Sequence, residues 1–143
     1  MKVDVATLCH AASSNGNLLD IVGAFNISYA ESVPHVLPVL TLALRLILEE
    51  TDEGSHVLQV RIIGTDGNEL FKASQKFELG PPQIVPIEGF SHPATSLCLQ
   101  FGLPHLVIRS FGAQSIEWRL DSQQPETTEF YIFPEIVQSA PEC

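Results

Sequence analysis

Apolar and polar residues alternate along most of this chain with a period of two, which predicts β-strands. The clearest run is 40–48, in which every second position is a leucine. A helix would distribute those leucines around its circumference, so the run indicates a strand with one buried face. The runs 58–63, 97–101 and 116–120 repeat the pattern, and Trp118 belongs to the inward-facing set of the last one.

Turn residues separate these runs. Asn15-Gly16 and Asp66-Gly67 supply the positive φ angles that tight hairpin turns require. Gly102–His105 interrupts a strand pattern with a proline, which predicts a turn or a bulge there. About nine strands result, at residues 3–9, 17–29, 39–49, 56–64, 69–79, 95–102, 106–111, 115–121 and 128–133.

Many short strands with turns between them, and no capped helix, are typical of an all-β fold. We therefore predict an antiparallel β-sandwich of about eight to nine strands with Greek-key character. A partly closed barrel is the alternative. No repeat and no low-complexity segment divides the chain, so a single domain over residues 1–143 is expected.

Two segments do not fit a simple meander. Residues 80–94 form a long, proline-rich connection, and such loops usually cover an edge, cross between sheets or bind something. The strand at 128–133 contains Phe130-Tyr131-Ile132-Phe133 and is therefore apolar on both faces. A strand of that kind is buried on both sides.

The composition adds a core and an acidic surface to this description. Of the 143 residues, 45% are hydrophobic, which suffices for a buried core. No stretch approaches the ~20 apolar residues of a membrane helix. The start, Met1–Ala6, has no cationic segment followed by an apolar stretch, so no secretory signal is predicted and a soluble, cytoplasmic protein without a membrane partner is expected. The net charge is −10 and the few Lys and Arg residues are scattered singly, which disfavours nucleic acid as a partner.

Three segments of the first half of the chain share a pattern of turn glycines and strand residues. They are Asn15-Gly16 with Leu19, Ile21, Gly23 and Phe25, the strand that follows Pro38, and the segment 56–67. In these segments the chain resembles a bacterial family of small β-rich proteins of unknown function, and the likeness fades after Leu79. One apparent extra residue near Asn17 departs from the family pattern. Because the shared features are turn glycines and strand leucines, the resemblance implies a β-sandwich and implies no activity.

The common catalytic motifs are missing from the sequence. It contains no GxSxG elbow, no phosphate-binding glycine loop and no HExxH. Cys9-His10 is the one adjacent pair with nucleophilic residue types, but neighbours on a strand point to opposite faces. A buried cysteine followed by a loop histidine is the favoured interpretation, and no cofactor is predicted.

The loop histidines define an alternative. If consecutive strands run antiparallel, their loops gather alternately at two ends of the sandwich, and one end would hold His10, Asp52, His56 and His92. Imidazole and carboxylate ligands suit zinc and other divalent ions. Each of these residues is alone on its loop, so solvated loop residues are the favoured interpretation, and a metal site or a small enzyme at this end is the alternative.

We predict a non-enzymatic binding or assembly module. A terminal strand commonly lies at a sheet edge, and an apolar edge needs charge, proline or a cover. The cover for 128–133 is either residues 80–94 or a second subunit, and a homodimer or another protein partner is the favoured interpretation. The predicted interface residues are Phe130, Tyr131, Phe133 and Ile136.

The three cysteines, Cys9, Cys98 and Cys143, are far apart in the sequence and form no CxxC pair. We therefore predict that all three are reduced in the native protein. Alkylation without reductant, followed by mass spectrometry, should give three modified thiols. Loss of two of these modifications would indicate a disulfide and an oxidising compartment.

Overall fold

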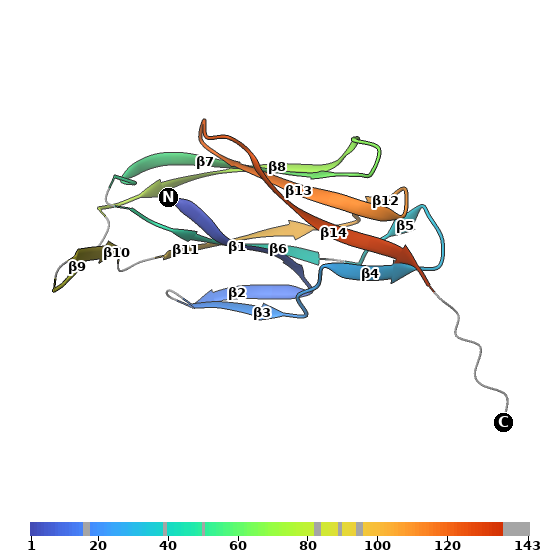
Figure 1. The fold of residues 1–143 in the computed structure, drawn as a ribbon, viewed down its shortest axis with the longest axis horizontal. Helices are drawn as coiled ribbons and strands as arrows, with labels where there is room; N and C mark the ends of the chain where they lie inside the picture. Colours follow the sequence, from blue (N-terminus) through green and yellow to red (C-terminus); the bar gives the residue numbers. More distant parts are fainter. Residues whose placement is uncertain are drawn as a thin grey trace, which may run out of the picture.

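Strands are the regular elements of the computed structural model, as the period-two pattern predicted (Figure 1). The structure describes residues 1–15, 18–38, 40–49, 51–81, 84–88, 90–93 and 96–135. The strands are β1 (Lys2–Cys9), β2 (Ala11–Asn15), β3 (Leu18–Val22), β4 (Ile27–Ala30), β5 (His35–Val36), β6 (Leu40–Ile47), β7 (Gly54–Ile63), β8 (Glu69–Leu79), β9 (Ile84–Ile87), β10 (Phe90–Pro93), β11 (Ser96–Leu103), β12 (Val107–Ile108), β13 (Gly112–Leu120) and β14 (Glu126–Pro134).

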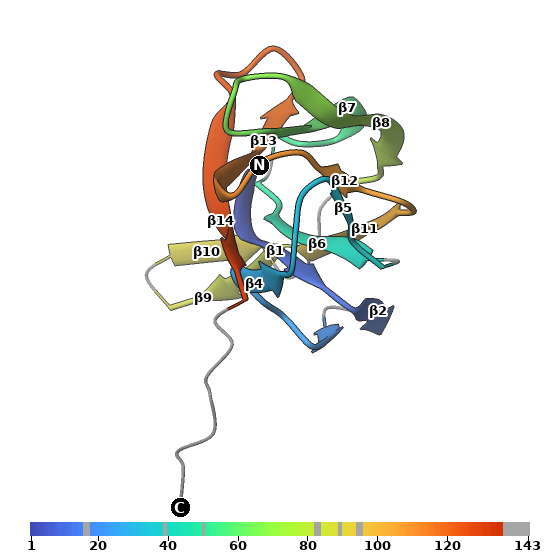
Figure 2. The same ribbon diagram turned by 90° about the vertical axis from the view of Figure 1, so that its right-hand side faces the viewer.

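Two larger sheets face each other. A three-stranded sheet has the order β1-β6-β11, and a five-stranded sheet with the order β4-β14-β13-β7-β8 curls over it (Figures 1 and 2). The hairpins β2-β3 and β9-β10 and the short pair β5-β12 form three further two-stranded sheets. The pairs are antiparallel except for β14 and β4, which run parallel. The predicted all-β fold, a β-sandwich or partly closed barrel, is confirmed.

The core lies between the two sheets. The leucines at every second position from Leu40 to Leu48 are all buried, so the predicted inward face of β6 is confirmed. Opposite them, the five-stranded sheet contributes alternate residues of β7, β13 and β14, and Trp118 is buried among them as predicted. These inward residues are Leu58, Val60, Ile62, Ile116, Trp118, Leu120, Phe130 and Ile132.

The predicted strand at 17–29 is wrong. Its residues form two separate strands, β3 and β4, and the predicted loop before it contains the strand β2. Gly23 lies at the break with a φ of +67°, a backbone conformation that glycine adopts without strain. A Cβ at Gly23 would lie 2.2 Å from Cδ2 of His10, so no other residue fits this position without a shift of the histidine.

Two further boundaries differ. The predicted connection 80–94 contains the hairpin β9-β10, which lies at the opposite end of the molecule from β4 (Figure 1). The strand predicted at 106–111 is reduced to the two residues of β12. Within the described ranges, no helix is long and apolar enough to cross a membrane.

Cys9 and Cys98 are free thiols. They lie on β1 and β11, the two strands that flank β6, opposite Thr41 and Arg45 respectively. Strands two positions apart in a sheet are separated by about 10 Å, which exceeds the reach of a disulfide. Burial raises the pKa of both thiols, and Cys143 lies outside the described residues.

The position of β6 predicts where the fold is most sensitive to truncation of a side chain. Leu44 is fully buried at the centre of the three-stranded sheet, whereas Leu18 on β3 is 64% exposed. We expect Leu44→Ala to lower the free energy of unfolding by about 2–5 kcal/mol, and Leu18→Ala to change it by less than about 0.5 kcal/mol. Urea denaturation of the two variants measures the difference, and equal effects would contradict the assignment of β6 to the core.

Candidate functional site

The structure separates two of the loop histidines. His10 follows β1, whose last residue Cys9 pairs with Thr41, whereas His56 lies near Asp52, beyond the other end of β6. The length of the eight-residue β1, about 25 Å, therefore lies between them. The expected gathering of these two histidines does not occur because β2 and β3 pair with each other as a separate sheet, and Val22 at the end of β3 lies beside His10, where β1 finished.

His56 is held by hydrogen bonds at both ring nitrogens. Nδ1 lies 2.7 Å from Oδ2 of Asp121, and Nε2 lies 2.7 Å from the carbonyl oxygen of Asp52. Both partners are acceptors, so the arrangement favours the protonated ring, in which both nitrogens donate. The hydrogen bond to Asp121 is the main cause that raises the pKa of His56. With both nitrogens engaged in these hydrogen bonds, the ring is not available to a metal ion or to a substrate proton.

Asp121 ties the end of β13 to β7. Its Oδ1 accepts a hydrogen bond from the backbone N–H of Val57 at 2.8 Å, and its own N–H donates to the carbonyl of Val57 at 2.8 Å. Burial acts to raise the pKa of Asp121, but the hydrogen bonds from His56 and Val57 outweigh it and the pKa is lowered. The residue adopts a φ of +51° in this turn. The His56–Asp121 pair therefore holds the end of β13 against β7.

The Asp52 carboxylate has hydrogen-bond and ion-pair partners outside the His56–Asp121 pair. It accepts a hydrogen bond from the backbone N–H of Glu49 and lies 3.0 Å from the amino group of Met1. His92 lies on β10, and its side chain is outside the described part of the structure. Among the described residues, no three His, Cys, Asp or Glu side chains converge as a metal site would require.

The C-terminal strand is not at a sheet edge, contrary to the prediction. β14 lies between β13 and β4, and its register brings Tyr131 opposite Ile27 and Phe133 opposite Tyr29. Phe130 is 1% exposed and faces the core, so it is unavailable for the interface that the sequence predicted. Ile136 lies outside the described residues.

An apolar patch nevertheless forms where β14 meets β4. We call Ile27, Tyr29, Tyr131 and Phe133 the β4 patch. Ile27, Tyr29 and Phe133 are 44%, 56% and 38% exposed. The Phe133 ring stacks on Tyr131 with centroids 5.9 Å apart and contacts Tyr29 at 6.4 Å, and the Tyr131 hydroxyl donates to Glu129 at 2.7 Å. This hydrogen bond raises the pKa of Tyr131.

Tyr131 and Phe133 of this patch were predicted from the sequence, whereas Ile27 and Tyr29 were not. The two residues alternate with Ser28 and the buried Ala30, which is the period-two signal of a strand with one exposed apolar face. Because residues 17–29 were predicted as one strand, the short strand β4 was not recognised as a separate element. The parallel pairing that places them beside β14 has no local signature.

The two edges of the five-stranded sheet differ in charge. The outward positions of the β8 edge include Lys72, Lys76 and Glu78, and charged side chains discourage pairing with another strand. The β4 edge has the sequence Ile-Ser-Tyr-Ala and carries neither charge nor proline. Of the two edges, only β4 therefore lacks the usual protection against strand addition.

Comparison with known proteins gives a family and no activity. The model of DUF6941, described as a family of unknown function, matches residues 4–133. The match extends well beyond the half of the chain in which the sequence resemblance was visible. No curated protein matches the chain.

The His56–Asp121 pair predicts a pH dependence. Its contribution to stability is complete between the unfolded pKa of Asp, near 3.8, and that of His, near 6.5, because the folded pKa of Asp121 is lowered and that of His56 is raised. The contribution is lost as the pH rises from 6.5 through the folded pKa of His56. Since the Asp121 side chain is 37% exposed, we expect an effect of at most about 1 kcal/mol.

Urea denaturation at pH 6 and pH 9 measures this loss. Asp121→Asn should reduce the decrease in the free energy of unfolding between the two pH values. Asp20→Asn, which alters an exposed carboxylate on β3, should leave it unchanged. An unaltered decrease in the Asp121 variant would show that another group titrates.

Proposed function

Because the chain belongs to DUF6941, whose function is unknown, we propose its role from its surface: it is a non-enzymatic assembly module that pairs with a second copy of itself through β4. The observation that carries this proposal is the β4 patch at an unprotected sheet edge. The aromatic rings and Ile27 lie on the outer face of that edge, and the strand itself offers backbone groups to a partner.

The β4 edge is compatible with a dimer of two-fold symmetry. In an antiparallel pair of β4 strands, the same residues meet across the axis, which is the requirement for a self-complementary interface. The chain carries a net charge of −10, so self-association requires a surface without like charges in direct opposition. β4 has no charged residue, and the pairing would join the two five-stranded sheets into one.

The area is sufficient for the centre of an interface. With about 200 Å² for a fully exposed large side chain, the exposed fractions of Ile27, Tyr29 and Phe133 amount to roughly 300 Å². A standard interface buries about 800 Å² on each partner. The backbone of β4 and the polar residues around the patch would supply the remainder, which is the usual arrangement of an apolar centre and a polar rim.

The alternatives receive less support from the geometry. An enzyme or metal site on the loop histidines would need an available nitrogen on His56, and both nitrogens are hydrogen-bonded. Cover of the patch by residues 80–94 would need that segment near β4, whereas β9 and β10 lie at the other end of the molecule (Figure 1).

We infer a cytoplasmic location from the two free thiols. No partner in membranes or nucleic acids is proposed for this edge.

Charged substitutions in the β4 patch test the assembly. Sedimentation at micromolar concentration should show a dimer, and Tyr29→Glu together with Phe133→Glu should convert it to a monomer, because like charges would then face each other across the axis. Leu18→Glu together with Val22→Glu is the matched control, since both residues are apolar and 64% exposed on β3. The control variant should remain dimeric.

The outcomes separate assembly from folding. A strict monomer of the unaltered chain at all concentrations would overturn the proposal, as would equal dissociation of both double variants. Circular dichroism and thermal unfolding show whether the Tyr29 and Phe133 variant keeps its fold. If it unfolds, the single variant Tyr29→Lys repeats the test at the more exposed of the two positions.

A further inference from the structure

Four of the seven Lys and Arg residues of the chain lie on the outer face of the five-stranded sheet. These are Arg61, Lys72, Lys76 and Arg119. They are scattered along the sequence, but the register places Arg61 opposite Lys72 on one side and opposite Glu117 on the other. The next pair along the strands is Gln59 and Arg119. The same face also carries Glu78, Glu117 and Glu129, so the excess of positive charge is confined to the area around Gln59, Lys72 and Arg119.

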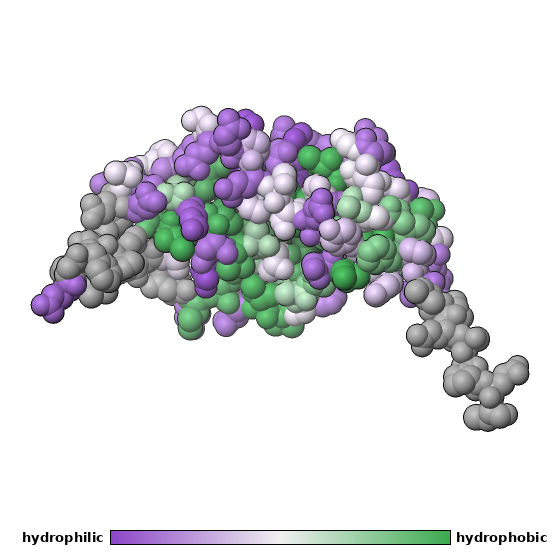
Figure 3. All heavy atoms as spheres, in the orientation of Figure 1, coloured by the Kyte–Doolittle hydropathy of each residue, from purple (hydrophilic) through white to green (hydrophobic). Residues whose placement is uncertain are grey.

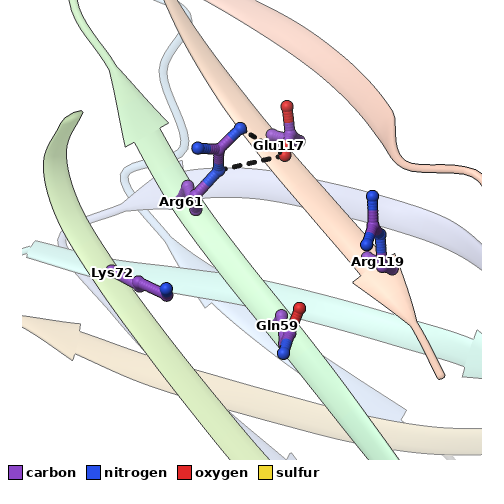
Figure 4. A pocket seen from close by; sticks show the side chains of 5 residues that line it. All are labelled: Gln59, Arg61, Lys72, Glu117 and Arg119. Atoms are coloured by element: carbon purple, nitrogen blue, oxygen red, sulfur yellow. Dashed lines mark hydrogen bonds and ion pairs between the residues drawn. The ribbon is translucent and has the colours of Figure 1, made fainter. Parts of the chain in front are cut away.

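A hollow of about 280 Å³ opens at the centre of this area. Gln59 and Arg61 of β7 lie at its middle, Lys72 comes from β8, and Glu117 and Arg119 come from β13 (Figure 4). All five side chains alternate with inward residues of their strands. The sheet that holds the core thus also fixes the backbone positions of the hollow.

The charges of the hollow are unevenly paired. Arg61 donates to Oε1 of Glu117 from Nε at 3.0 Å and from Nη2 at 2.8 Å, and its Nη1 lies 3.6 Å from Glu69. Within the described ranges, Lys72 and Arg119 have no carboxylate within 4.0 Å. Three cationic side chains and one carboxylate line the hollow, and with Glu69 beside Arg61 the local charge is +1.

We propose that this hollow binds the phosphate group of a small organic phosphate, independently of assembly through β4. Lys72 lies on β8 opposite Arg61, and Arg119 lies on β13 opposite Gln59, so the two residues come from the strands on either side of β7 (Figure 4). Those strands are about 10 Å apart, a span that the two long side chains can bridge around one phosphate group. Arginine binds phosphate oxygens with a two-pronged fork and lysine with a point charge, and the Gln59 amide adds a neutral donor.

The size and lining of the hollow specify the ligand further. A volume of about 280 Å³ exceeds the ~30 Å³ of a water molecule several times, so an organic group fits beside the phosphate. Among the residues that the structure describes, no apolar side chain lines the hollow, which favours a polar group such as a sugar over an aromatic or aliphatic one. Glu117 can accept hydrogen bonds from the hydroxyl groups of such a ligand through the oxygen that Arg61 leaves free.

Titration with inorganic pyrophosphate and with ribose 5-phosphate tests the site by nuclear magnetic resonance at constant ionic strength. We expect saturable shifts of the backbone amides of Gln59, Lys72 and Arg119. The variant Lys72→Gln with Arg119→Gln should lose affinity on the order of tenfold or more, because each lost charged hydrogen bond has about that effect. The control Lys2→Gln with Arg109→Gln removes the same charges elsewhere and should bind as the unaltered chain does.

The variant Glu117→Gln provides a second test at a residue that lines the hollow. It removes the one carboxylate and releases the Arg61 guanidinium, so affinity for both probes should rise. Shifts that are absent, or that persist unchanged in the Lys72 and Arg119 variant, would overturn the proposal. A short single-stranded oligonucleotide that binds the same residues more tightly than either probe would also overturn it and would indicate a nucleic-acid surface instead.

Discussion

The burial of alternate side chains between the two larger sheets is the interaction on which the rest of the structure depends. Leu42, Leu44 and Leu46 of β6 face the inward residues of β7, β13 and β14, and the most central of these side chains are inaccessible to water. Since the side-chain period of a strand is two, a shift of one residue would bring this entire set to the surface. Burial therefore fixes the register of each strand, and the register in turn selects the residues that face outward.

The outer face of the five-stranded sheet is a product of this constraint. Arg61 lies between the buried Val60 and Ile62, and Arg119 lies between Trp118 and Leu120. Hydrophilic and apolar residues occupy different parts of this face. The cationic hollow lies on β7, β8 and β13, and the β4 patch lies where the end of β14 meets β4. Figure 3 shows hydrophilic residues along the upper rim of the molecule, over β7 and β8.

Local sequence patterns were sufficient to predict the core strands and insufficient to predict which strands pair with each other. The leucine alternation in β6 and the inward position of Trp118 followed from the sequence, because burial on one face leaves a period-two record. The pairing of β4 with β14 left no such record, and Phe130 was consequently assigned to an interface while Ile27 and Tyr29 were missed. The cationic area was missed for the same reason, since its members are neighbours across strands and distant along the chain.

The parallel pairing of β4 and β14 has a consequence for the order of folding. Ile27 pairs with Tyr131, a separation of roughly a hundred residues, whereas β7 and β8 are consecutive strands joined by a tight turn. Contacts between such distant segments carry a large loop-closure entropy and tend to form late. Until β4 docks, the backbone of β14 has an open edge on the same side. A β4 strand from another molecule would satisfy that edge with the same hydrogen bonds, so a late docking of β4 would leave a route by which two chains exchange strands.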